Sequence, residues 1–159
     1  MTELFHWRRN GAWHLGAVDG TDRPRLLDLW EAAVRATHHF LAEEDIQFYR
    51  RMLARQYFDL VRLICLRDER GRILGFSGTA EDRLEMLFVD PAHHGEGIGK
   101  VLLRHSIEQR GVRLVDVNEQ NHEALGFYIA QGFVRVGRSA LDGANRPFPL
   151  LHLRLRDSA

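Results

Sequence analysis

Apolar positions along the chain change their spacing several times, and each change predicts a new element. After Thr21 and Asp22, which can cap a helix, apolar side chains recur three and four residues apart as far as Thr37. A second helix is expected after the acidic segment 43–45. Further strands are predicted over 13–18, 62–66, 72–80, 83–89, 113–117, 133–141 and 150–155, and further helices over 97–109 and 121–131.

The predicted order is β-αα-βββ-α-β-α-ββ, which combines hairpin strands with strand–helix–strand crossovers. An α/β fold with a mixed sheet and helices on its faces accommodates that order most economically. The chain has 159 residues and contains no repeat, low-complexity tract or linker, so a single domain over residues 1–159 is expected.

Charge and composition narrow the class of protein. Lys+Arg and Asp+Glu both number 22, so no net field favours nucleic acid or a membrane surface. Cys65 is the only cysteine and lies in an apolar run, where a buried and inert thiol is expected. His93, His94 and His122 lack zinc-site spacing, so no metal is expected. The first residues do not form a signal peptide and no run reaches membrane-spanning length, which predicts a cytoplasmic protein.

A glycine-rich segment follows the strand that ends at Asp90-Pro91. Gly95, Gly97 and Gly99 alternate with other residues just before a predicted helix. Such a turn lets successive backbone N–H groups point at an anion on the helix N-terminus, and a phosphate group is the natural occupant. The Walker A and dinucleotide-binding patterns both fail on spacing.

This strand–Asp-Pro–glycine–helix pattern resembles motif A of the GNAT superfamily of acetyltransferases. The resemblance implies that backbone amides from Glu96 to Lys100 bind the pyrophosphate of acetyl-CoA. His94 stands where arginine or glutamine is commonest in the family. The cofactor-binding residues implied on this segment are His94, Gly95, Glu96, Gly97, Ile98, Gly99 and Lys100.

A second segment strengthens the resemblance. Asn121, Ala124, Phe127, Tyr128, Gly132 and Phe133 match the family pattern Asn-x-x-Ala-x-x-φ-Tyr-x-x-x-Gly-Phe. Asn121 is expected to cap the helix, and the resemblance adds it to the cofactor-binding set. Tyr128 is either a core tyrosine or, as the resemblance implies, a cofactor-contacting general acid that serves the leaving thiolate. Gly126 suggests a close approach to strand 113–117 or to the pantetheine arm.

The sequence says less about the residues that bind and deprotonate the amine acceptor. Strict alternation on strand 83–89 would place Glu85 on one face with Leu87 and Val89. By resemblance Glu85 is the candidate base, and the backbone N–H groups of Leu87 and Val89 are candidates for contacting the thioester and pantetheine. His38 and His39 are rival bases, with a solvated helix end as the plainer interpretation. Trp30, His38, Phe40 and Asn118 are the candidate acceptor-binding residues, and Phe148 is a further pocket candidate.

The combined interpretation is an acetyl-CoA-dependent N-acetyltransferase that acts by direct attack of a primary amine. A small-molecule amine, a protein lysine and a protein N-terminus all stay open as acceptors. The alternative function is a CoA-binding sensor or interaction module without turnover. The resemblance also leaves a homodimer open, since GNAT domains often dimerise.

Overall fold

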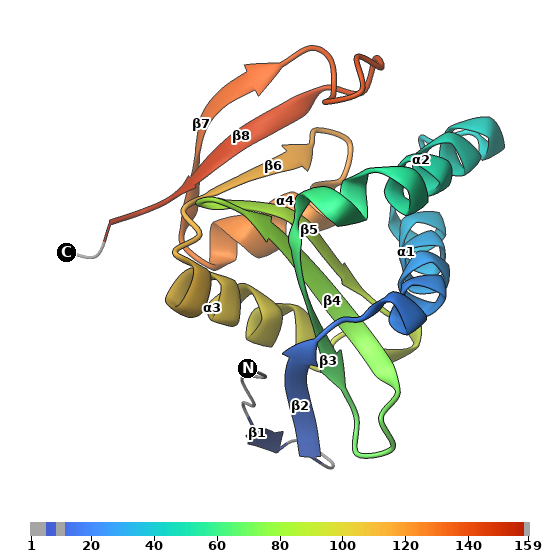
Figure 1. Cartoon of the computed structure of the whole chain (residues 1–159). Coiled ribbons are helices and arrows are strands. Elements are labelled where there is room, and N and C mark those ends of the chain that lie inside the picture. Colours follow the sequence, from blue (N-terminus) through green and yellow to red (C-terminus); the bar gives the residue numbers. More distant parts are fainter. Residues whose placement is uncertain (1–5, 9–11, 158–159) are drawn as a thin grey trace.

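A computed structural model describes residues 6–8 and 12–157 of the chain and has one eight-stranded mixed sheet (Figure 1). The sheet order is β1-β2-β3-β4-β5-β6-β8-β7. The strands are β1 (His6–Arg8), β2 (Ala12–Ala17), β3 (Arg62–Arg67), β4 (Ile73–Ala80), β5 (Arg83–Val89), β6 (Leu114–Asn118), β7 (Phe133–Ser139) and β8 (Leu150–Leu155). The helices are α1 (Arg23–Thr37), α2 (Glu43–Arg55), α3 (Ile98–Arg110) and α4 (His122–Ala130), with short 3₁₀ turns η1 (Gly20–Asp22), η2 (Tyr57–Leu60) and η3 (Pro91–His93).

The expected order of elements is confirmed, with small additions. The sequence pattern missed β1, which is only three residues long, and the turn η2, which takes Tyr57 out of the second helix. Asp22 is the N-cap residue of α1, as predicted, but its side chain makes no capping hydrogen bond to that helix. That carboxylate instead accepts a hydrogen bond from Arg67 Nη2 at 2.8 Å, which ties the start of α1 to β3.

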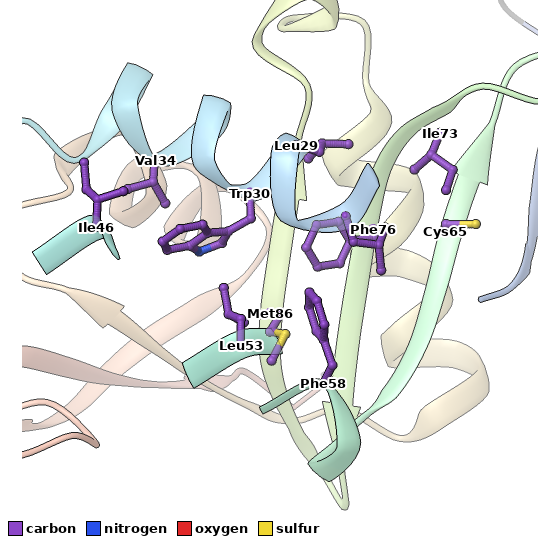
Figure 2. Packing of buried hydrophobic residues seen from close by; sticks show 11 residues of the cluster. Leu29, Trp30, Val34, Ile46, Leu53, Phe58, Cys65, Ile73, Phe76 and Met86 are labelled. Carbon is purple, nitrogen blue, oxygen red and sulfur yellow. The ribbon is translucent and has the colours of Figure 1, made fainter. Parts of the chain in front are cut away.

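Helices cover both faces of the sheet. The first two helices pack on one face, where Trp30 of α1 and Leu53 of α2 lie over Phe76 and Met86 (Figure 2). On the other face, α3 and α4 cover a second cluster that includes Leu103 and Tyr128. Cys65 is fully buried, as expected, and burial raises the pKa of its thiol to about 11. No helix in the described part of the chain is both long and apolar enough to cross a bilayer.

Gly75 on β4 fixes how closely α3 approaches the sheet. A Cβ atom at this position would lie 2.9 Å from Ile98 Cγ2 and 3.1 Å from the carbonyl oxygen of Phe88. Ile98 is the first residue of α3, so the missing side chain of Gly75 seats the N-terminus of that helix against the sheet.

The sheet opens between β5 and β6. These two strands are parallel and pair only at Arg83–Leu114 and Leu84–Val115. Every other pair of neighbouring strands in the sheet is antiparallel. The C-terminal part of β5, beyond Leu84, therefore has a sheet partner on its β4 side alone, and Figure 1 shows β6, β8 and β7 turning away from it.

Candidate active site

The glycine-rich segment forms a backbone cradle at the N-terminus of α3. Gly95 and Gly97 have positive φ angles of 81° and 92°, and Gly97 is the N-cap of the helix. The first N–H groups of any α-helix have no partner within the helix, and the helix dipole makes them attractive to an anion. No acidic residue lies in the first turn of α3. The cradle therefore has the backbone geometry that a phosphate group needs, and phosphate binding there stays a prediction.

The polar side chains of His93, His94 and Glu96, beside the cradle, pair with other side chains. The Glu96 carboxylate turns to His93, whose Nδ1 lies 2.9 Å from Glu96 Oε2. His94 is exposed, and its Nε2 lies 3.1 Å from a carboxylate oxygen of Glu123 at the start of α4. Gly99 lies close to Phe127 of α4 and Val89 of β5. A Cβ atom at this position would be 3.5 Å from Phe127 and 3.8 Å from Val89.

The free edge of β5 presents backbone donors to the gap in the sheet. Asp90 N–H donates to the carbonyl oxygen of Leu74 at 2.8 Å, on the β4 side. Successive residues of a strand point their N–H groups to opposite edges. The N–H groups of Leu87 and Val89 therefore point away from β4, toward the opening between β5 and β6.

Tyr128 lies on α4 and belongs to the buried cluster that includes Leu84 of β5 and Val115 of β6. Its ring is buried and makes edge contacts with Phe127 and Phe133, at centroid distances of 5.1 and 5.6 Å. Leu87 packs against the same cluster. Burial raises the pKa of the Tyr128 phenol above its usual range, so the hydroxyl stays protonated near neutral pH. Both sequence interpretations of Tyr128, core residue and proton donor, are compatible with this position.

Glu85 does not share a face with Leu87 and Val89, so that expectation is wrong. The register of β4 and β5 shifts after Gly78, which pairs with Met86, while Thr79 pairs with Leu84. Glu85 is thus the extra residue of a β-bulge, and a bulge interrupts the alternation of faces. Leu84, Leu87 and Val89 face α3 and α4, whereas Glu85 lines a pocket on the other face with Met86 and Phe88.

This pocket has a volume of about 480 Å³ and lies between the first two helices, the open part of the sheet and the β7–β8 loop. Trp30, His38, Phe40 and Asn118, all predicted from the sequence, line it together with Glu85 and Phe148. Most of the lining is aromatic or aliphatic, and neither lysine nor arginine occurs among the lining residues. Burial raises the pKa of the Glu85 carboxyl, which Arg83 lowers in part from 3.7 Å.

His38 connects the pocket to the start of α4. Thr37 Oγ donates to the carbonyl oxygen of Ala33 at 2.9 Å, so it accepts from His38 Nδ1 at 2.7 Å. The His38 Nε2 atom then carries a lone pair, which lies 3.5 Å from the amide nitrogen of Asn121. The Asn121 oxygen caps α4 by accepting from Ala124 N–H at 3.1 Å, as predicted. Burial, with a smaller contribution from His39, lowers the pKa of His38 to about 4.

Apart from Phe148, sequence reasoning missed the outer wall of the pocket, which the β7–β8 loop forms. The β7–β8 loop is tied to α2 by a hydrogen bond from the Tyr49 hydroxyl to the Asp142 carboxylate. Arg146 pairs with Asp45 at 2.9 Å and stacks on Phe48, with its guanidinium 3.7 Å from the ring centroid. These contacts join residues about a hundred positions apart, so no local sequence pattern predicts them. Phe148 was the one residue of this loop that the sequence analysis placed at the pocket.

Gly126 makes no close approach to strand β6. A Cβ atom at this position would meet nothing within 4 Å, so the expected contact with that strand is wrong. Gly126 lies on an exposed part of α4, and its packing does not require a glycine.

Comparisons with known proteins agree with this geometry. A family model described as an acetyltransferase (GNAT) domain matches residues 60–135. The chain is 37% identical to peptidyl-lysine N-acetyltransferase YjaB of Escherichia coli K12 over 131 residues, which cover 80% of this chain and 86% of that protein. It is 35% identical to the protein of the same name from Salmonella typhimurium LT2, over 81% of this chain and 88% of that protein.

Solved structures share the fold. The solution structure of apo YjaB from Escherichia coli superimposes with a TM-score of 0.83 and 32% identity, over 92% of this chain and 99% of that one. The PaiA N-acetyltransferase of Thermoplasma acidophilum, solved in complex with coenzyme A, superimposes with a TM-score of 0.69 and 18% identity, over 91% and 99% of the two chains.

Proposed function

Because this chain belongs to the GNAT family of acetyltransferases, which acetylate amines with acetyl-CoA, we propose that its acceptor is the side chain of a protein lysine. Two relatives that match most of the chain are named peptidyl-lysine N-acetyltransferases. The pocket beside Glu85 is the observation in this molecule that favours the same acceptor.

The pocket has the chemistry that a lysine side chain needs. Aromatic rings of Phe40, Phe148 and Trp30 offer an apolar surface to the four methylene groups of lysine. The Glu85 carboxylate offers a negative charge to the ammonium group, and the absence of lysine and arginine from the lining avoids repulsion. Protein lysine therefore fits better than an acceptor that carries an anionic group near its amine.

The donor site follows from the cradle and from the free edge of β5. We expect the N–H groups from Glu96 to Lys100 to hold the pyrophosphate of acetyl-CoA, since positive φ angles at Gly95 and Gly97 shape that segment. The N–H groups of Leu87 and Val89 point into the gap in the sheet, where pantetheine amides and the thioester carbonyl would find donors. Bound acetyl-CoA supplies an acetyl group activated as a thioester.

Two side chains provide the proton transfers. Glu85 accepts a proton from the lysine ammonium, directly or through a water molecule, which frees the amine to attack the thioester carbon. The raised pKa of the Glu85 carboxyl lies closer to the pKa of the lysine ammonium than the ordinary pKa of a glutamate does. Leu87 N–H stabilises the negative charge on the carbonyl oxygen, and the Tyr128 hydroxyl donates a proton to the departing sulfur. The nitrogen loses its second proton as the amide forms, and that proton restores the Tyr128 phenol.

His38 is a weaker candidate for the base. Its pKa of about 4 makes it a poor proton acceptor at neutral pH, and the Asn121 amide faces its only lone pair. We assign it instead to the pocket wall, where it orients Asn121 at the start of α4.

A peptide panel tests the acceptor. The first peptide has an acetylated N-terminus and one lysine; the second has norleucine in place of lysine and a free N-terminus; spermidine is the third acceptor. Each is incubated with the full-length protein and acetyl-CoA, and products are identified by mass spectrometry. We expect acetylation of the first peptide only.

Acetylation confined to the second peptide or to spermidine would contradict a lysine acceptor while leaving acetyl transfer intact. Acetyl-CoA binding without any product would favour the alternative of a CoA-binding module. A cytoplasmic location and a homodimer remain predictions from the sequence, and sedimentation analysis of the purified protein tests the second.

A further inference from the structure

A second group of reactive side chains crosses the sheet outside the pocket. It consists of Ser139 on β7, His152 on β8 and Asp116 on β6. Ser139 Oγ lies 2.6 Å from His152 Nε2, and His152 Nδ1 lies 2.6 Å from Asp116 Oδ1. The three strands are adjacent in the sheet order β6-β8-β7, so the side chains form one row on one face.

With a neutral imidazole, the hydrogen atoms in this row have one consistent arrangement. An ionised carboxylate accepts hydrogen bonds, so His152 Nδ1 is the donor to Asp116. In the neutral imidazole Nε2 then carries the lone pair and accepts the hydroxyl proton of Ser139. A serine whose hydroxyl donates to a histidine, with that histidine held by a carboxylate, is the arrangement of an activated nucleophile.

The backbone is adapted to this row. Gly137 is the register partner of His152, and a Cβ atom there would lie 3.3 Å from His152 Cδ2. A larger residue at 137 would crowd the imidazole ring. Arg83 Nη1 holds Asp116 Oδ1 from another side at 3.0 Å, which keeps the carboxylate in place.

The row also has access to solvent and to a neighbouring binding surface. The side chains of His152 and Asp116 are 33% and 29% exposed. Ser139 pairs in register with Leu150, which in turn pairs with Asn118, and both partners line the acceptor pocket. Because β7 ends the sheet, its outer edge carries backbone N–H groups that no strand of the described sheet pairs, and these are a source of donors for an oxyanion.

We propose that Ser139, His152 and Asp116 form a second reactive site, a nucleophilic serine site for small carboxylic esters at the rim of the acceptor pocket. Ser139 Oγ attacks the ester carbonyl while its proton passes to His152 Nε2. The bond to the alcohol oxygen breaks as His152 returns that proton to the leaving alcohol, and an acyl-serine remains. Water, deprotonated by His152, then cleaves the acyl-serine to a carboxylic acid and free Ser139.

A fluorophosphonate probe tests this site directly, because it reacts with activated serines and loses fluoride. The full-length protein is incubated with the probe, digested, and mapped by mass spectrometry. We expect one adduct, on Ser139. Ser77 and Ser106, which are both 1% exposed, serve as internal controls and should stay unlabelled.

Two variants then separate an activated serine from an exposed one. His152→Gln should slow labelling roughly 10²-fold, the usual contribution of a general base, and Asp116→Asn should slow it less. Thermal unfolding of each variant checks that the fold is kept. Absence of an adduct on the wild-type Ser139, or labelling of folded His152→Gln at the wild-type rate, would overturn the proposal and leave the row as a cross-strand hydrogen-bond network.

Discussion

Gly97 and Gly111 lie at opposite ends of α3, and both have a left-handed backbone conformation, with φ angles of 92° and 68°. An aspartate at either position would introduce the same charge with similar backbone strain. Only Gly97 belongs to the cradle. The two positions therefore provide a matched pair for testing where the cofactor binds.

We expect Gly97→Asp to abolish acetyl-CoA binding, because its carboxylate would face the pyrophosphate at the N-terminus of the helix. Gly111→Asp should bind acetyl-CoA as the wild type does, although it will be less stable. Calorimetric titration of both variants measures the difference. Equal affinities in the two folded variants would contradict the cradle.

Tyr128→Phe removes one hydroxyl from a buried position. Turnover of a lysine peptide should fall roughly 10²-fold, since the thiolate then leaves without a proton donor. The Kd for acetyl-CoA should hardly change, because the ring keeps its contacts with Phe127 and Phe133. Steady-state kinetics measures the turnover and calorimetry measures the Kd. Unchanged turnover would contradict the proton-donor role and leave Tyr128 with a structural role alone.

The low pKa of His38 predicts how stability depends on pH. Folded His38 is neutral above about pH 4, whereas unfolded histidine titrates near 6.5. Between these values the unfolded chain binds more protons, so the free energy of unfolding rises with pH across this window, by at most about 3 kcal/mol. His38→Gln should flatten that rise, while His122→Gln, at an exposed position, should keep it. Urea unfolding at pH 4.5 and 7 compares the variants.

Two glycine-to-alanine substitutions should have opposite effects on stability. Gly75→Ala would force a Cβ atom against Ile98 and the backbone oxygen of Phe88, at a cost of roughly 1–3 kcal/mol. Gly126→Ala meets open space on a helix and should stabilise the protein by about 1 kcal/mol. Thermal unfolding of both variants measures these stability changes. Destabilisation by Gly126→Ala would contradict the prediction and indicate a constraint at this position that the fold does not explain.

Much of the fold could be predicted because its signals are local. The bounds of β5 and β8 match their predicted ranges, and Gly97 and Asn121 stand at the starts of α3 and α4 as expected. In each case a periodic run is bounded by residues with a specific backbone role. The cradle was found for the same reason, since a helix N-terminus and its glycines are contiguous in sequence.

The acceptor side was harder to predict because it depends on register and on distant contacts. Alternation alone placed Glu85 on the wrong face, since the bulge opposite Gly78 depends on the pairing of β4 with β5. The clamp between Tyr49 and Asp142, and the row formed by Ser139 and His152, require the packing of separate segments. Those contacts cannot be predicted from the spacing of residues within one segment.

The most direct test of the proposed mechanism is the pH dependence of kcat/KM for a lysine peptide in wild type and in Glu85→Gln, with Glu69→Gln, in an exposed turn, as control. Wild type and control should lose activity as pH falls through an apparent pKa above that of an ordinary glutamate, because the base must be ionised. Glu85→Gln should lower kcat/KM about 10²-fold and lose that titration, with acetyl-CoA affinity unchanged. A Glu85→Gln profile that overlays the control would contradict the role of Glu85 as the base that prepares the lysine.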